Sequence, residues 1–73
     1  MYKTVDELVD ALIDTSIRET RTVRLQDEFA GCSWGNIDTE EIATALSAHA
    51  DDNSEEPDFW GERDGQEWRV IIY

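Results

Sequence analysis

The chain has little of the residue chemistry that marks small enzymes and metal sites. Its 73 residues include one cysteine, one histidine and one proline. Cys32 alone can form neither an internal disulfide nor a paired-cysteine zinc site. A hydrolytic triad needs a base beside its nucleophile, and no motif pairs His49 with a serine, cysteine or carboxylate. We therefore expect a structural, partly buried His49, and no catalytic residue, metal or cofactor.

Long apolar segments are also missing. No run approaches the roughly 20 residues of a membrane-spanning helix. The start at Met1 lacks the apolar stretch of a secretory signal. We expect a protein that begins at this methionine and works in the cytoplasm without binding a membrane.

Basic residues are few. Six lysines and arginines stand against 18 aspartates and glutamates, which gives a net charge of -12, and Lys3 is the only lysine. Such a chain repels nucleic acid, so we expect no direct nucleic-acid binding. Self-repulsion of this size destabilises a compact state, and it calls for a basic partner, a demand for solubility or a salty environment.

The length allows one domain, residues 1–73, which we expect to be monomeric. A chain this short buries only about 60% of the surface that it exposes when unfolded. A raised carboxyl pKa for acid–base catalysis needs burial that so small a core hardly provides.

The first helix is predicted over residues 4–17. Apolar residues recur at helical spacing on one face, beginning at Val5, and Thr4 with Glu7 has the spacing of a capping box. On the other side lie Asp6, Asp10 and Asp14, separated by about 6 Å per step along the axis. This side is a candidate acidic stripe.

A strand of about five residues follows, because residues 22–26 alternate with Val23 and Leu25 on one side. Residues 27–36 contain two glycines and no clear period, which predicts a loop anchored by Phe29 and Trp34.

A second helix is predicted from Asp38 to about Ala50. Asp38 and Glu41 have the capping-box spacing, and Ile37 is placed to pack on Ile42. Ile42, Ala45, Leu46 and His49 are expected to share its apolar face. An exposed acidic turn follows over residues 51–58, where carboxylates oppose the helix dipole, so local stability does not explain them.

A hairpin closes the chain. Asp64-Gly65 suits a type I′ turn, which needs positive φ at both positions. The resulting register sets Trp68 opposite Gly61. The side chains expected on the core face are Phe59, Trp68, Val70 and Ile72, and those expected on the outer face are Trp60, Glu62, Glu67, Arg69, Ile71 and Tyr73.

These elements predict an α+β fold in the order helix, strand, helix, hairpin, with two helices packed on a small antiparallel sheet of undetermined strand order. The predicted core residues are Val5, Leu8, Leu12, Val23, Leu25, Leu46, Trp68, Val70 and Ile72.

A calcium loop is the one metal motif to weigh. Asp51, Asn53 and Glu55 alternate as in an EF-hand, and Glu62 falls at the twelfth position. Glu56, however, occupies the place of the required glycine, and a strand follows instead of a helix. Weak cation binding at the surface is the most that this segment predicts.

The acids are unevenly distributed. Between Leu25 and Gly61 there are ten aspartates and glutamates and no lysine or arginine. B-DNA spaces its phosphates about 3.4 Å apart along each strand, so acids about 6 Å apart on a rigid helix can stand in for alternate phosphates. A solvated surface that only aids solubility is the simpler interpretation.

In size, acidity and α+β pattern the whole chain resembles the small acidic anti-CRISPR proteins of phages and mobile elements, which inhibit type I CRISPR surveillance complexes. The resemblance implies a non-enzymatic inhibitor, acting in the host bacterial cytoplasm, that blocks target-DNA binding by occupying a basic DNA path. The implied contact residues are Asp6, Asp10, Asp14, Asp38, Glu40, Glu41, Asp51, Asp52, Glu55, Glu56, Asp58 and Glu62, with Trp60 or Trp34 as an aromatic anchor.

Two other interpretations stay open. Acid-rich, lysine-poor composition also resembles proteins of halophiles, in which the acids hold hydration. The same electrostatics would equally serve an antitoxin-like or anti-restriction interaction module with a different basic partner.

Overall fold

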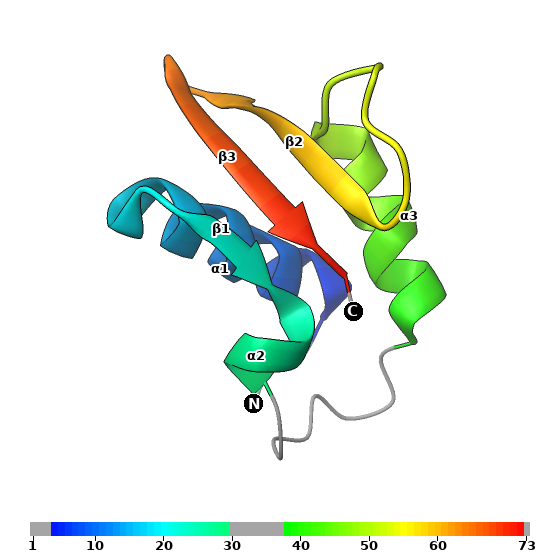
Figure 1. Ribbon diagram of the computed structural model, residues 1–73. Helices are drawn as coiled ribbons and strands as arrows, with labels where there is room; N and C mark the ends of the chain where they lie inside the picture. Colours follow the sequence, from blue (N-terminus) through cyan, green and yellow to red (C-terminus); the bar gives the residue numbers. More distant parts are fainter. Residues whose placement is uncertain (1–3, 30–37, 73) are drawn as a thin grey trace.

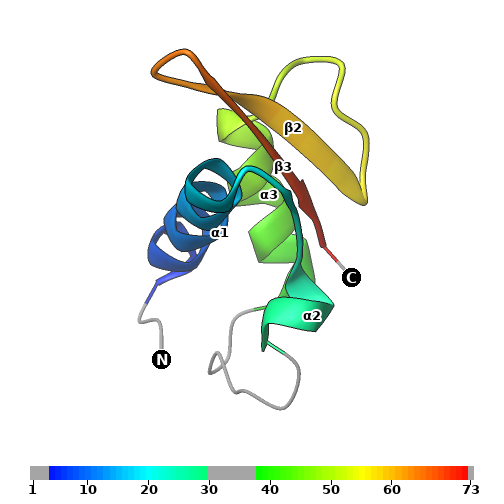
Figure 2. The ribbon, with the colours of Figure 1, turned by 60° about the vertical axis from the view of Figure 1, so that its left-hand side comes forward.

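The computed structural model describes residues 4–29 and 38–72. Two long helices lie on one face of a three-stranded sheet, and the described residues leave the other face uncovered (Figures 1 and 2). This confirms the predicted α+β fold. The elements are α1 (Val5–Glu19), β1 (Thr22–Arg24), α2 (Leu25–Phe29), α3 (Thr39–His49), β2 (Asp58–Arg63) and β3 (Gln66–Ile71).

The sheet is mixed, so the prediction of an antiparallel sheet was wrong. Its order is β1-β3-β2; β2 runs antiparallel to β3, while β1 runs parallel to it with Val23 opposite Val70. Parallel neighbours need a long crossover, which the segment containing α2, α3 and β2 supplies. Alternating apolar residues show which face of a strand is buried, but they do not show the direction of its neighbour.

Helix α1 begins and ends with recognisable caps. The hydroxyl of Thr4 accepts a hydrogen bond of 3.1 Å from the backbone N–H of Glu7, as the capping motif predicts. The helix extends to Glu19, two residues beyond the prediction, and ends at Thr20, whose φ is 51°. Val5, a predicted core residue, is only partly buried at the start of this helix.

Strand β1 is shorter than predicted. It ends at Arg24, and Leu25 begins helix α2, although Leu25 is buried as expected. Leu25 would be buried either as the next inward-facing residue of the strand or as the first residue of a helix. The alternation of apolar residues could therefore not distinguish the two structures. The predicted loop 27–36 thus begins inside α2. The roles predicted for Trp34, Ile37 and the side chain of Phe29 lie outside the described residues.

Helix α3 starts at the predicted N-cap. The carboxylate of Asp38 accepts a hydrogen bond of 3.0 Å from the backbone N–H of Glu40, and not from the third helical residue, Glu41, as the capping box expects. The buried side chains are Ile42, Ala43 and Leu46. The placement of His49 was wrong: it is exposed, because partly buried Ala50 takes the next position of the apolar stripe.

The hairpin matches its prediction as far as Ile72, and the predicted place of Tyr73 lies outside the described residues. Asp64 and Gly65 have φ of 52° and 80°, and Gly61 pairs with Trp68. An ideal Cβ on Gly61 would lie 2.9 Å from the Trp68 ring and 3.0 Å from the His49 carbonyl oxygen. Glycine at this position therefore lets the indole and the end of α3 both approach β2.

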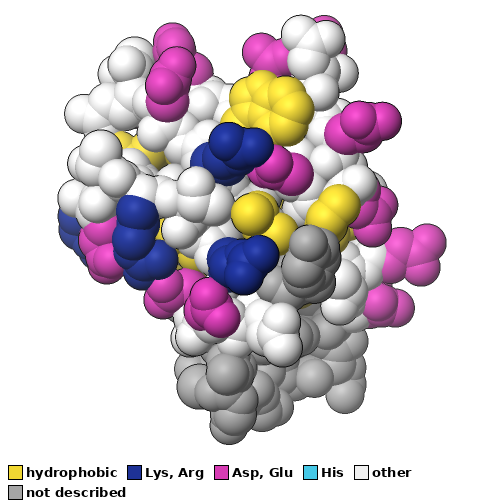
Figure 3. All heavy atoms as spheres, in the orientation of Figure 1, with side chains coloured by type: hydrophobic (Ala, Val, Ile, Leu, Met, Phe, Trp, Pro, Cys, Tyr) yellow, Lys and Arg dark blue, Asp and Glu magenta, His cyan; other side chains and the backbone are white. Residues whose placement is uncertain are grey.

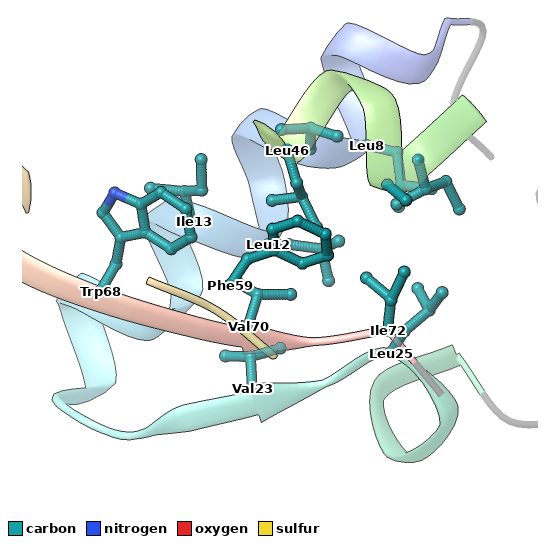
Figure 4. Close-up of a cluster of buried hydrophobic side chains, with 13 residues drawn as sticks. Leu8, Leu12, Ile13, Val23, Leu25, Leu46, Phe59, Trp68, Val70 and Ile72 are labelled. Atoms are coloured by element: carbon teal, nitrogen blue, oxygen red, sulfur yellow. The ribbon is translucent and has the colours of Figure 1, made fainter. Parts of the chain in front are cut away.

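The core lies between the helices and the sheet. The aromatic rings of Phe59 and Trp68 lie among side chains from α1 and α3, and Val23 lies against Val70 (Figure 4). Ser16 is the one buried polar side chain found there among the described residues, at 2% exposure. Within the same residues, no helix has both the length and the apolar character needed to cross a bilayer.

Candidate functional site

The acidic stripe of α1 is largely neutralised by arginines. Asp10 accepts a hydrogen bond of 2.8 Å from Arg63 of β2, and Asp14 accepts one of 3.2 Å from Arg18 one turn later. Asp6 forms no ion pair within the described residues. The three acids therefore do not act as one uniform row of negative charge.

Asp6 instead belongs to an acidic groove where the first turns of α1 and α3 meet. Asp38, Glu40 and Glu41 line the groove opposite Asp6, and its volume is about 580 Å³. None of these four carboxylates has an ion-pair partner in residues 4–29 or 38–72. The first turn of α3 is consequently one of the places in the described residues where negative charge is unopposed.

A second such place is the acidic turn, residues 51–58, beyond the other end of α3. Asp51, Asp52, Glu55 and Glu56 are exposed, and the structure shows no ion pair to them from the part of the chain that it describes. They share this exposure with Asn53. The turn therefore presents four carboxylates at the end of α3 opposite to the acidic groove.

The backbone of the turn has a structural role that the sequence did not suggest. The N–H of Asp51 donates to the Trp60 carbonyl oxygen at 2.7 Å, and the Ser54 hydroxyl both donates to that oxygen and accepts from the Trp60 N–H. The carboxylate of Asp51 also accepts a hydrogen bond of 2.8 Å from the backbone N–H of Asn53. The turn thus covers the outer edge of β2, an edge that would otherwise expose unpaired backbone groups. Local stability does account for Asp51, contrary to expectation, but not for Asp52, Glu55 or Glu56.

Trp60 and Asp58 share a cationic neighbour on the open face of the sheet. Two nitrogens of the Arg69 guanidinium, Nε and Nη2, donate to the two carboxylate oxygens of Asp58, the Nε bond at 2.9 Å. This pairing lowers the pKa of Asp58 and raises that of Arg69. The Arg69 guanidinium also lies 5.7 Å from the centre of the Trp60 ring. Of the predicted contact residues, Asp58 is therefore already paired within the fold, and Trp60 is partly covered.

Glu62 lies on the same open face, directly opposite Glu67. Both are exposed, and like charges across a strand pair repel each other. The pair lies apart from the groove and the turn, near the tip of the hairpin.

Four arginines of the described residues are held by neighbouring acids. Arg21 pairs with Glu19 and with Glu28, and both hydrogen bonds raise its pKa. In the view of the open face (Figure 3), arginine side chains lie over the sheet and acidic side chains lie mostly around the margin. The pairs Arg18–Asp14 and Arg21–Glu19 are local in sequence. The other pairs join elements whose packing only the structure shows.

The described residues form no metal site. No group of three or more histidine, cysteine, aspartate or glutamate side chains there is arranged to hold a metal ion. Comparisons with family models, curated proteins and solved structures found no match to this chain. The unopposed acids at the two ends of α3 are thus the most distinctive feature of the surface.

Proposed function

We propose that the protein is a non-enzymatic inhibitor that occupies the DNA-binding path of a basic complex, a type I CRISPR surveillance complex being the candidate target. The contact surface in this proposal is the exposed side of α3 with its two acidic ends. The acidic groove (Asp6, Asp38, Glu40 and Glu41) lies at one end, and the acidic turn lies at the other.

The observation that carries the proposal is the separation of the charges. The arginines neutralise acids of α1 and the sheet, whereas the acids flanking α3 have no such partner in the described chain. Acids kept for solubility alone have no need of this arrangement. A basic partner would gain most by binding where its charges meet carboxylates that are not already paired.

The spacing of the two acidic ends supports DNA mimicry. The 11 residues of α3 rise about 16 Å in total, and the exposed residues between the ends, Thr44, Ser47, Ala48 and His49, carry no formal charge at pH 7. B-DNA likewise has two phosphate-lined edges, on either side of a major groove about 12 Å wide. A basic surface shaped for such edges can meet both ends of α3 at once.

Competition for DNA tests the proposal. Purified protein should displace labelled target DNA from a type I surveillance complex at low salt, and the displacement should weaken as salt rises. Failure of the wild-type protein to displace DNA from the complex would sink the proposal.

Matched variants then locate the contact. D52N/E55Q/E56Q should weaken inhibition about tenfold, since charged contacts at a binding surface each contribute about 0.5–1 kcal/mol. The control D10N/D14N/E19Q removes the same charge from carboxylates that are already paired with arginines. An equal loss in both variants would contradict a contact at the acidic turn and indicate a diffuse field instead.

A further inference from the structure

The sheet has an incomplete edge beside the first half of β3. Strand β1 pairs only with Arg69, Val70 and Ile71, so in the described residues no strand lies against the side of Gln66–Trp68 that faces away from β2. The hydroxyl of Ser16 accepts a hydrogen bond of 2.9 Å from the backbone N–H of Arg69. This bond takes the place of a strand partner at the point where the pairing of β3 with β1 ends. In a strand, N–H and C=O groups of alternate residues point to the same side. Those of Glu67 therefore point to the same open side as those of Arg69.

A wide concavity reaches this edge. Its volume is about 1020 Å³, and it extends from Thr20 and Arg21 at the end of α1, past Gln66 and Glu67, to Trp60 on the open face. A concavity beside an unpaired strand edge has room for one more extended segment, which would prolong the line of β1. Added strands of this kind bind through their backbone groups, and their side chains determine specificity.

The charges around the concavity favour a basic occupant. Glu62 and Glu67 lie opposite each other with Cβ atoms about 5 Å apart, and neither has an ion-pair partner among the described residues. The arginines of the same wall are already engaged, Arg21 by Glu19 and Glu28, and Arg69 by Asp58. The indole of Trp60, next to Glu62 on the open face, already has the Arg69 guanidinium 5.7 Å from its centre and is only half-buried, so its remaining exposed surface is of the kind on which guanidinium groups stack.

We propose that this concavity binds an extended, arginine-bearing segment of a basic partner, which pairs with the edge of β3 at Glu67 and places a cation between Glu62 and Glu67. The proposal rests on the proposed function in that the segment belongs to the same basic partner. A second copy of this chain is a poorer occupant, because it would bring its own charge of -12.

A synthetic peptide of alternating arginine and glycine tests the site without any CRISPR complex. NMR titration should shift the amide signals of Glu62 and Glu67 and the indole signal of Trp60, and hydrogen exchange at the Glu67 amide should slow several-fold. E62Q/E67Q should weaken peptide binding about fivefold. D10N/D14N, which removes the same charge from carboxylates already paired with arginines, should leave binding nearly unchanged.

Three results would overturn the proposal: unchanged exchange at Glu67, equal weakening by both double variants, or sedimentation as a dimer that W60A disperses. The last would assign the face to a second copy. Failure to displace DNA, by contrast, concerns only the proposed function, because the peptide titration measures the concavity directly.

Discussion

The hydroxyl oxygen of Ser16, near the end of α1, accepts a hydrogen bond of 2.9 Å from the backbone N–H of Arg69 in β3. The same hydroxyl donates to the carbonyl oxygen of Arg21 at 2.7 Å. One buried side chain thus joins the helix end, the approach to β1 and the central strand. Because β1 begins only at Thr22, it does not pair with the N–H of Arg69, and the Ser16 hydroxyl bonds to this group instead.

S16A should therefore destabilise the protein by about 1–2 kcal/mol, because it leaves a partly buried donor, the Arg69 N–H, and a partly buried acceptor, the Arg21 carbonyl, without their partner. Urea unfolding followed by circular dichroism measures the change. S47A is the matched control: Ser47 is exposed, and its hydroxyl donates to the Ala43 carbonyl within its own helix. A similar loss in both variants would contradict the bridging role.

G61A should destabilise the fold by about 1–3 kcal/mol, since the added methyl group meets the Trp68 ring and the His49 carbonyl. The double-mutant cycle with W68F isolates the ring contact. The cost of G61A should shrink in the W68F background, where the benzo part of the indole is gone. An unchanged cost would attribute the whole effect to the backbone of α3.

T20G should stabilise the protein by about 1 kcal/mol. Thr20 ends α1 with φ of 51°, a conformation that is strained for a β-branched residue and free of strain for glycine. The midpoint of urea unfolding should rise with an unchanged slope. T20A keeps the positive φ with a side chain, so a gain as large as that of T20G in this variant would argue against the explanation.

The Asp58–Arg69 pair should make stability depend on acid pH. Hydrogen bonding to Arg69 lowers the pKa of Asp58 below its ordinary value of 3.8. The folded state then binds this proton less readily than the unfolded state, so the pair stabilises the fold above that value and the effect is lost as pH falls through the lowered pKa.

D58N should accordingly cost about 0.5–1 kcal/mol at neutral pH, and the difference from wild type should vanish in acid. Urea unfolding at a series of pH values measures it. D52N is the comparison, because Asp52 has no ion-pair partner among the described residues. A D58N difference that persists unchanged in acid would show that the pair contributes nothing.

Salt distinguishes the inhibitor from a salt-adapted protein. Screening of the -12 charge should raise the melting temperature by a few degrees and level off well below 1 M, where the Debye length is already about 3 Å. Differential scanning calorimetry over a range of sodium chloride concentrations checks this. Stability that keeps rising to several molar would favour the halophile interpretation instead.

The sequence predicted the parts of the fold that depend on local signals. Thr4 and Asp38 marked helix starts, and Asp64-Gly65 set the hairpin register that places Gly61 opposite Trp68. The direction of β1 was missed because it depends on which strand Val23 meets far along the chain. His49 was misplaced because helical spacing allows either His49 or Ala50 to follow Leu46 on the apolar face, and Ala50 packs there.

The acidic surface was predictable in total but not in its distribution. Counting identified the acids, but only packing shows that Arg63 neutralises Asp10 across the layers and that Arg69 holds Asp58. Nor could spacing reveal that Ser54 and Asp51 cover the edge of β2. These ion pairs and hydrogen bonds determine which carboxylates stay unpaired and can bind a partner. They form between elements that are distant in sequence.

The central position of β3 has a consequence for how the chain folds. This strand comes after every other described element, yet both β1 and β2 pair with it. During synthesis α1 and β1 have no sheet to pack on until β3 has emerged from the ribosome. Closing the parallel pair early would cost the entropy of a long loop. We therefore expect the hairpin to form first and to serve as the template on which the amino-terminal half condenses.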